Sequence, residues 1–325
     1  AQYLLTGQFS LSYYRYMIGM FFNKILFTKA GVEYPYQTVL NGDWDFQEVA
    51  ELSAKFYVDL DGQGDVNVDD QFGYVMWVGP ASSLTDGYMA SAGLRVVGKD
   101  GENFYVSDLS STADFSNAID NILKMMYSDG SYTSSTYFDV VGKFTAGTAA
   151  LTSFRLFFLE ETGMMNLGET GQGYGILPLP KSDSETQDEY YSYIQDQCLL
   201  YAIPRTVEGA KRVEASQFLE AYASESYQTV KSAYYERALT TRYAKDPESV
   251  QMLEIMESST FFDPANIYIG TAFKAFGTTQ LRDMYASGTN TIGSLLQGKR
   301  DLIVEEAIKL NQAFQKLWKA SEEAR

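Results

Sequence analysis

Hydrophobic positions recur at helical spacing in two parts of the first half of the chain. Asp45 is followed three residues later by Glu48, which is the capping-box pattern of a helix start. The apolar residues after it share one helical face: Phe46, Val49, Leu52 and Phe56. A second helix is expected from about Asp114 to Gly130, with an apolar face made of Phe115, Ala118, Ile119, Ile122 and Met126.

Short apolar runs that end at glycine or proline predict strands between these helices. Residues 71–77 form one such run, and residues 174–178 form a short buried one that closes at proline. Residues 199–203 are expected to form another strand, which Pro204 stops. The apolar stretch 144–158 is interrupted by Gly147.

The pattern becomes mostly helical after Pro204. Residues 210–222 predict a helix whose apolar side chains are Val213, Phe218, Leu219 and Tyr222. Asp246 followed by proline is a strong helix start. A last helix is expected from about Asp301 to the chain end, with Ile303, Ala307, Leu310, Phe314 and Leu317 on its apolar face. Strands mixed with helices predict an α/β fold in which helices cover a sheet.

Composition excludes several classes of function. The 325 residues include no histidine, which removes Ser–His–Asp and Cys–His catalysis, imidazole proton transfer and histidine metal sites. The net charge of −17 argues against nucleic acid, because such binding depends on Lys and Arg neutralising phosphates. It also disfavours anionic lipid surfaces and strongly anionic ligands. The single cysteine, Cys198, forms no internal disulfide and is expected to be a small buried residue.

Aromatic residues are unusually frequent, whereas membrane-spanning segments are absent from the sequence. The chain has 25 Tyr, 20 Phe and 3 Trp, which suits a surface for neutral, hydroxyl-rich or ring-shaped ligands. No run of about 18 apolar residues occurs, so no helix is expected to cross a membrane. The apolar run 16–22 is short and carries no cleavage pattern, so no signal peptide is expected within this sequence.

The acidic loop from Asp59 to Asp70 has the spacing of a calcium-binding loop. Counted from Asp59, oxygen-bearing side chains fall at positions 1, 3, 5, 9 and 12, and glycine stands at position 6. Position 7 offers a backbone carbonyl. Two positions depart from the usual pattern, since Gln63 replaces Asp or Asn and Asp70 replaces Glu. The loop predicts either a structural Ca²⁺ site or an acidic surface turn; its ligands would be Asp59, Asp61, Gln63, Asp65, Asn67 and Asp70.

Between Phe22 and Tyr222, a set of segments stands in a characteristic order. They are FNKILFTKAG at 22–31, GDWDF at 42–46, DQFG at 70–73, SAG at 91–93, FTAGTAAL at 144–151, YGILPLPK at 174–181, and AIP at 202–204 with the helix after it. The set resembles the extracellular solute-binding proteins of ABC transporters, in their sugar-binding, maltose-binding-protein-like branch of clostridial type. Phe22, Leu151 and Arg205 depart from the family pattern but keep size and chemistry.

The resemblance implies a two-lobe α/β fold of the periplasmic-binding-protein type II class. Lobe II would comprise residues 17–197 and 259–325, and lobe I residues 1–16 and 198–258. Family members carry a longer segment ahead of the FNK-type motif, whereas 21 residues precede Phe22 here. The expectation is therefore a complete lobe II and a partial lobe I, which lacks its N-terminal part.

The resemblance also implies a function without catalysis. A small mono- or oligosaccharide would be captured between the lobes, which close like a hinge, and delivered to ABC permease subunits in the membrane. The protein would be an extracytoplasmic monomer, either periplasmic or a cell-surface lipoprotein, that requires no cofactor. By position relative to the motifs, the expected ligand contacts are Trp77, Phe154, Arg155, Phe157, Tyr193, Asp196, Gln197, Tyr268, Tyr13 and Tyr14.

Other functions remain open from the residues alone. Binders of amino acids, peptides or polyamines are the nearest alternative, because Arg155, Arg205 or Arg237 would suit an α-carboxylate. A carbohydrate hydrolase that uses two carboxylates needs no histidine, although no motif supports it. Most of the aromatic residues must form the core, so each nominated Phe or Tyr also has a packing interpretation. Arg155 also has a structural interpretation, as an ion-pair partner of Glu160 or Glu161.

Overall fold

Helices and strands alternate along most of the chain. The computed structural model describes residues 6–7, 10–95, 97–100, 103–106, 112–160, 164, 173–195, 197–204, 206–234, 246–261 and 279–322. Its helices are α1 (Leu11–Arg15), α2 (Lys24–Ala30), α3 (Tyr36–Asn41), α4 (Phe46–Phe56), α5 (Asp86–Ser91), α6 (Thr112–Tyr127), α7 (Tyr137–Thr145), α9 (Gly209–Ser226), α10 (Pro247–Ser258), α13 (Thr279–Ser287) and α14 (Ile292–Glu322), with the 3-10 helix η1 (Leu156–Glu160). Its strands are β1 (Ile18–Asn23), β2 (Phe72–Trp77), β3 (Val97–Asp100), β4 (Asn103–Val106), β5 (Ser131–Ser134), β6 (Ala149–Arg155), β7 (Tyr174–Leu177), β8 (Ser192–Tyr193) and β9 (Thr260–Phe261).

A five-stranded sheet organises the described part of the chain. Its strand order is β5-β2-β6-β1-β7. Strand β2 runs parallel to β5 and β6, whereas β1 runs antiparallel to β6 and β7. Every strand except β1 therefore points the same way. The carboxyl ends of β5, β2, β6 and β7 consequently meet the amino end of β1 at one edge of the sheet.

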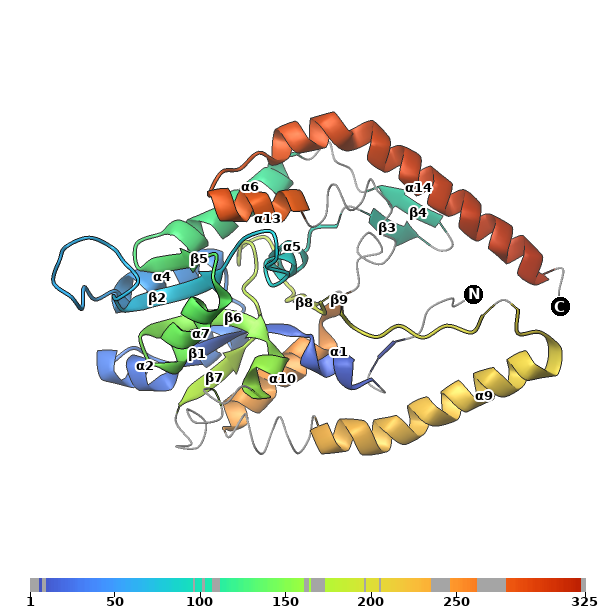
Figure 1. Ribbon diagram of the computed structural model, residues 1–325, viewed down its shortest axis with the longest axis horizontal. Coiled ribbons are helices and arrows are strands. Elements are labelled where there is room, and N and C mark those ends of the chain that lie inside the picture. Colours follow the sequence, from blue (N-terminus) through green and yellow to red (C-terminus); the bar gives the residue numbers. More distant parts are fainter. Residues whose placement is uncertain are drawn as a thin grey trace.

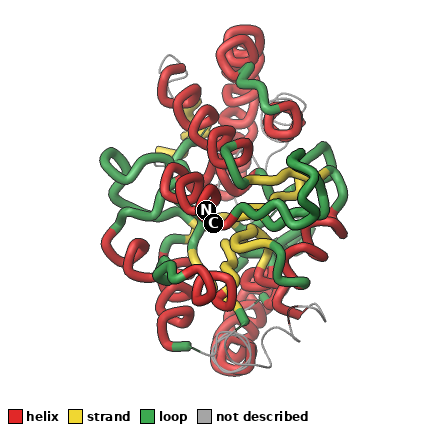
Figure 2. Tube along the Cα trace, turned by 90° about the vertical axis from the view of Figure 1, so that its left-hand side faces the viewer, coloured by secondary structure: helices red, strands yellow, loops and turns green. Residues whose placement is uncertain are grey.

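Helices cover the sheet and bury its side chains. Helix α4 packs against β2 and α6, α7 packs against β2 and β6, and α10 packs against β7. The strands lie between helices above and below them when the molecule is viewed along its long axis (Figure 2). Helices α9 and α14 extend beyond the sheet on opposite sides (Figure 1). The mixed α/β class expected from the sequence is confirmed.

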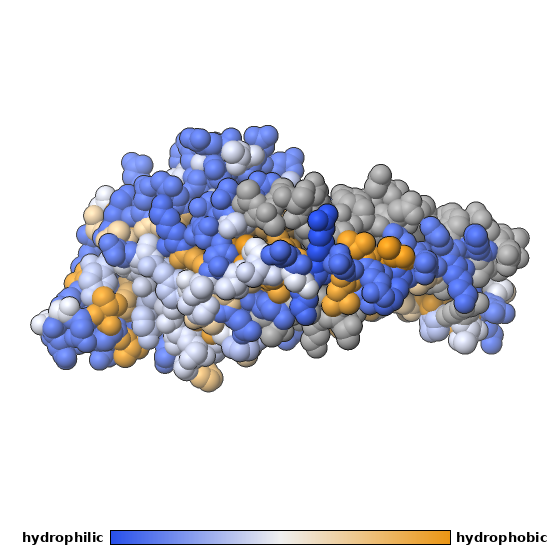
Figure 3. Space-filling view, turned by 90° about the horizontal axis from the view of Figure 1, so that it is seen from above, coloured by the Kyte–Doolittle hydropathy of each residue, from blue (hydrophilic) through white to orange (hydrophobic). Residues whose placement is uncertain are grey.

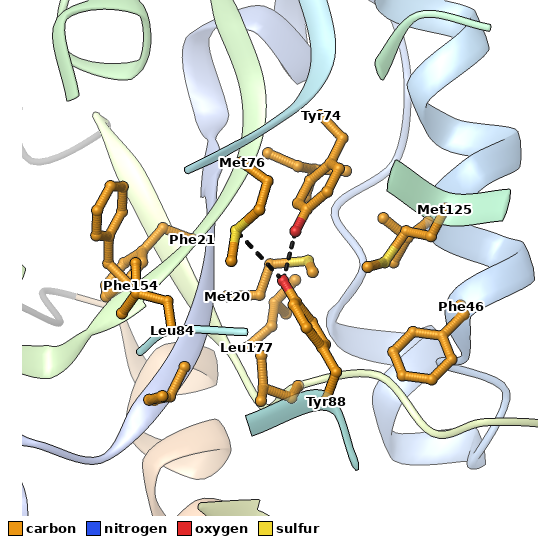
Figure 4. Packing of buried hydrophobic residues seen from close by; sticks show 14 of the residues in the cluster. Met20, Phe21, Phe46, Tyr74, Met76, Leu84, Tyr88, Met125, Phe154 and Leu177 are labelled. Atoms are coloured by element: carbon orange, nitrogen blue, oxygen red, sulfur yellow. Dashed lines mark hydrogen bonds between the residues drawn. The ribbon is translucent and has the colours of Figure 1, made fainter. Parts of the chain in front are cut away.

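Aromatic and methionine side chains fill the interior beside β2. The hydroxyl groups of Tyr74 and Tyr88 share a short hydrogen bond, and Tyr88 also donates to the sulfur of Met76 over 3.6 Å (Figure 4). Both tyrosines are fully buried. Burial raises the pKa of Tyr88 to about 12, so this pair stays neutral and hydrogen-bonded at ordinary pH. Much of the aromatic excess in the sequence is therefore core.

Most of the predicted elements are confirmed. Helix α4 begins after Asp45, whose carboxylate accepts the backbone N–H of Glu48 over 2.9 Å. Strands β2 and β7 and helices α6 and α10 also lie where the sequence predicts them. The strand predicted at residues 199–203 is wrong, because only Tyr201 has bridge character. The last helix begins at Ile292, earlier than Asp301.

The predicted division into lobes remains a prediction, and two helices bear on it. The sequence predicts residues 247–258 in lobe I, whereas α10 packs on β7 of the main sheet and Met256 lies against Gly19 of β1. Helix α9 forms as predicted, but its apolar side chains face solvent: Phe218 is 68% exposed and Val213 is 57% exposed.

The upper face is mostly hydrophilic and has small, separate apolar patches (Figure 3). Among the described residues, no helix combines the length and apolar character needed to cross a bilayer.

Candidate functional site

The carboxyl edge of the main sheet gathers several of the nominated ligand contacts. Trp77 ends β2, and Arg155 ends β6, the strand beside it. The register pairs Arg155 with Ile18, the first residue of β1. In open α/β sheets, ligands bind outside the carboxyl ends of the strands, so this edge is the expected binding position.

Trp77 belongs to a row of aromatic rings at this edge. Its ring meets Tyr137 edge to face with centroids 5.5 Å apart, and Tyr137 meets Phe154 in the same way over 5.6 Å. The Trp77 indole N–H donates to the carbonyl of Ser135 over 3.2 Å. Trp77 and Tyr137 are partly exposed, whereas Phe154 is 1% exposed. Trp77 therefore offers a fixed, accessible ring face, and Phe154 supports Tyr137 from within.

Arg155 lies beside a second aromatic pair. Its guanidinium carbon is 5.7 Å from the ring centre of Tyr16 and 5.9 Å from that of Phe157. One of its N–H groups donates to the side-chain carbonyl of Gln197 over 3.4 Å. Three nominated residues, Arg155, Phe157 and Gln197, thus lie together. They form a partly exposed group of cationic, aromatic and amide side chains.

Arg15 lies on the same aromatic ring but is already neutralised. Its guanidinium carbon is 4.4 Å from the centre of Phe157, and its fork donates to both oxygens of Glu160 over 2.9 and 2.8 Å. The hydroxyl of Tyr234 also donates to Glu160. Burial alone would lower the pKa of Arg15, but the hydrogen bond and charge of Glu160 raise it above its ordinary value. Arg15 and Glu160 therefore form a structural ion pair.

The loop after Trp77 is hydrogen-bonded to Gln195, in the segment between β8 and Gln197. Ser82 donates to the carbonyl of Trp77 over 2.7 Å, and the side chain of Gln195 hydrogen-bonds Ser83. The backbone N–H of Gln195 donates to the carbonyl of Tyr16. The two groups, around Trp77 and around Arg155, are therefore held by one network of hydrogen bonds.

Three other nominated tyrosines are buried. Tyr14 is fully buried, and Tyr13 donates its hydroxyl to Thr260 over 2.9 Å. Burial raises the pKa of Tyr13. Tyr193 is 3% exposed in β8. The structure places these residues in core packing, so ligand contact by them, as by Phe154, stays a prediction. Asp196 and Tyr268 lie outside the described residues.

Sequence reasoning missed Tyr16, Tyr137 and Arg15. Tyr137 follows β5, and since β5 runs parallel to β2, it reaches the same sheet edge as Trp77. Tyr16 precedes β1, whose antiparallel direction brings it to that edge as well. Predicting Tyr16 at this edge requires knowing that β1 runs antiparallel to its neighbours, and the local pattern of residues does not show strand direction.

The acidic loop lies at the opposite end of β2 from Trp77 (Figure 1). Carboxylate oxygens of Asp59, Asp61 and Asp70 all lie within 4.8 Å of one another. Asp59 accepts the backbone N–H groups of Gly62 and Gly64, as the sharp turn requires. Both glycines have positive φ angles, of 72° and 81°. Three of the six predicted ligands are therefore gathered.

The other three predicted ligands, Gln63, Asp65 and Asn67, take part in hydrogen bonds within the loop. The amide of Asn67 donates to Asp61 over 2.9 Å and to the carbonyl of Asp65 over 3.2 Å. Gln63 is exposed and gives its backbone N–H to Asp61. That bond and the Asn67 amide lower the pKa of Asp61, so it remains ionised well below neutral pH.

Asp70 links this loop to the body of the protein. It is fully buried and accepts the backbone N–H groups of Leu60 and Asn67 and the hydroxyl of Tyr57. Its own backbone carbonyl accepts from the ammonium of Lys143 over 2.8 Å. The loop conformation is thus preorganised by neutral donors and one nearby cation.

Comparison with known proteins identifies the fold. An ABC transporter solute-binding protein from Thermotoga lettingae with bound α-D-tagatose has a TM-score of 0.55 at 14% identity, covering 91% of this chain and 70% of its own. A maltose/maltodextrin-binding domain from Bdellovibrio bacteriovorus with maltotriose has a TM-score of 0.54 at 16% identity, covering 90% and 71%. A solute-binding protein from Agrobacterium vitis with D-mannitol has a TM-score of 0.52 at 15% identity, covering 90% and 71%.

The chain has the fold of these binding proteins. The predicted periplasmic-binding-protein-like α/β fold is confirmed at this level. No protein-family model matches the chain, and no curated protein matches it. The clostridial type, the partial lobe I and the lobe boundaries stay predictions.

Proposed function

We propose that this chain is a solute-binding protein that captures a small carbohydrate for import by an ABC transporter. The carrying observation is the placement of a partly exposed Trp77 and Arg155 at the carboxyl edge of the sheet, in a fold shared with proteins solved with bound sugars. Aromatic faces suit the C–H face of a sugar ring, and guanidinium and amide groups suit its hydroxyls.

The proposal also covers the protein's partners and its location in the cell. Delivery to membrane permease subunits follows from the transporter class, and the protein would act outside the cytoplasm, as a monomer, either free or as a lipoprotein. The ligand is held and released without bond cleavage. Closure around it would follow from tighter binding in the closed state. In this proposal the protein binds and releases a carbohydrate and is not an enzyme.

Removing Trp77 is expected to weaken sugar binding at least tenfold. The full chain is first screened by thermal shift against sugars such as tagatose, mannitol and maltotriose, beside amino acids and polyamines. A bound ligand raises the melting temperature as its concentration exceeds its dissociation constant. Trp77→Ala removes a fixed aromatic face, a loss on the order of 2 kcal/mol for an anchoring ring.

The matched control is Phe218→Ala on α9. Phe218 is 68% exposed and lies on a helix remote from the sheet edge, so its removal should leave sugar affinity within about twofold. If both variants bind the sugar as tightly as the parent chain, the proposed site is wrong. If amino acids alone shift the melting temperature, the carbohydrate proposal is wrong.

We also propose that the loop Asp59–Asp70 holds a structural Ca²⁺ ion. Its support is the clustering of Asp59, Asp61 and Asp70 together with the glycine turn. Ca²⁺ requires six to eight oxygens, which backbone carbonyls, Asn67 and water would complete. Because the loop and Trp77 lie at opposite ends of β2, the ion would brace the fold and not touch the sugar.

Millimolar Ca²⁺ is expected to raise the melting temperature of the parent chain, and a chelator should reverse the shift. An ion present at a hundred times its dissociation constant would add about 2.7 kcal/mol to the free energy of unfolding. The double variant Asp59→Asn/Asp61→Asn should lose this response, whereas Asp301→Asn on α14 should keep it. An equal Ca²⁺ response in the loop variant and the parent would exclude the site.

A further inference from the structure

Arg155 has more hydrogen-bonding capacity than its surroundings use. A guanidinium carries five N–H donors in a planar fork. Among the described residues, Arg155 makes one hydrogen bond, to Gln197, and its 3.4 Å length makes that bond weak. The Tyr16 and Phe157 rings lie 5.7 and 5.9 Å from the guanidinium carbon and do not accept its N–H groups as a carboxylate would. Most of the fork is therefore available.

Three other buried or half-buried cations have carboxylate partners, and the buried Lys143 and Lys181 each donate to a backbone carbonyl. Lys24 pairs with Asp246 over 2.7 Å, Lys231 with Glu257 over 3.1 Å, and Arg282 with Asp86. In the described part of the chain, no carboxylate lies within ion-pair distance of Arg155. Among the described residues, Arg155 differs from those five cations because it has neither a carboxylate nor a backbone carbonyl as its partner.

Of the two acids that the sequence offers Arg155 as ion-pair partners, Glu161 lies outside the described residues and Glu160 is already bonded to Arg15. Both oxygens of Glu160 accept from the fork of Arg15, and one also accepts from Tyr234. Arg15 and Arg155 share the ring of Phe157, at 4.4 and 5.9 Å from its centre. Within the part of the chain that the structure describes, two positive charges thus lie on one ring and one carboxylate pairs with them. A second carboxylate at Arg155 would balance the local charge.

We infer that the ligand carries a carboxylate that docks on the Arg155 fork, as an acidic sugar such as a uronate does. This inference rests on the proposed function and narrows its ligand class. A carboxylate matches the guanidinium fork with two parallel hydrogen bonds, whereas sugar hydroxyls do not carry the charge. An amino acid presents the same carboxylate, so the experiment separates the two sources.

The test is calorimetric titration of the full chain with D-galacturonate, which carries one carboxylate, compared with neutral D-galactose and with glutamate and alanine. The carboxylated sugar should bind at least about tenfold more tightly than the neutral one, because a charge-assisted hydrogen bond is worth that much. Arg155→Gln should remove this preference and change the neutral sugar less than about threefold. Arg155→Lys keeps the charge and loses the fork, so it should recover only part of the preference.

Arg300→Gln, an exposed site on α14, is the matched charge-removal control and should leave every affinity unchanged. Thermal unfolding of each unliganded variant checks that it is folded. Equal binding of neutral and acidic sugars overturns the inference while the proposed function stands. Binding of amino acids alone, lost in Arg155→Gln, supports the carboxylate contact and overturns the proposed function. If none of the probes binds, the inference is overturned.

Discussion

Gly73→Ala is expected to lower the free energy of unfolding by about 3 kcal/mol or more, at the upper end of overpacking changes. A Cβ atom at Gly73 would fall inside the van der Waals radius of the Ser53 carbonyl and Cα, which are backbone atoms of α4. Backbone does not rotate away as a flexible side chain does, so β2 and α4 would have to separate. A urea titration followed by circular dichroism measures the loss.

Gly142→Ala is the matched control for this variant. Gly142 lies inside α7, and a Cβ there meets nothing within 4 Å. Alanine is favoured over glycine in a helix interior by roughly 0.5–1 kcal/mol, so this variant should be neutral or slightly more stable. A Gly73→Ala protein as stable as the Gly142→Ala protein would contradict the close packing of β2 on α4.

Asp86→Asn is expected to destabilise the protein by roughly 3–5 kcal/mol, as removal of one partner of a buried ion pair does. The Asp86 carboxylate is 4% exposed and receives both arms of the Arg282 fork, one of them over 2.8 Å. Arg282 also donates to the carbonyl of Pro80, in the loop after Trp77. The variant should therefore loosen that loop and also weaken sugar binding.

The control is Glu305→Gln, which removes a carboxylate from an exposed pair with Lys309 on α14. Both side chains of that pair are more than half exposed, at 55% and 61%. Exposed pairs contribute about 0–1 kcal/mol, so urea unfolding should hardly change. An Asp86→Asn protein that unfolds at the same urea concentration as the control would show that the pair does not hold α13 in place.

The local sequence correctly predicted those helices that begin at a capping aspartate or end near a glycine. Asp45 and Asp246 cap α4 and α10, and Gly130 follows α6 with a φ of 81°. Residues 199–203 were misread because their apolar character resembles a strand, although Leu199 is 57% exposed. A segment becomes a strand only when neighbouring strands are placed to pair with it. The composition of the segment itself does not specify those neighbours.

The candidate site was predictable where a residue ends a strand. Trp77 and Arg155 both follow apolar runs, and parallel strands bring their ends to one edge. Tyr137 and Tyr16 were missed because they reach that edge through the order and direction of β5 and β1. Tyr14 was nominated from its position in the chain, but a residue's depth depends on the packing around it, and here Tyr14 is fully buried.

The central claim is that the protein binds a carbohydrate at this edge and leaves it unchanged. The most direct measurement is calorimetric titration with the sugar that gives the largest thermal shift, followed by chromatography of the recovered sugar. We predict saturable binding of one sugar molecule per chain, weakened in Trp77→Ala, with the sugar recovered intact. Failure of every sugar to bind, or recovery of a cleaved product, would contradict the account.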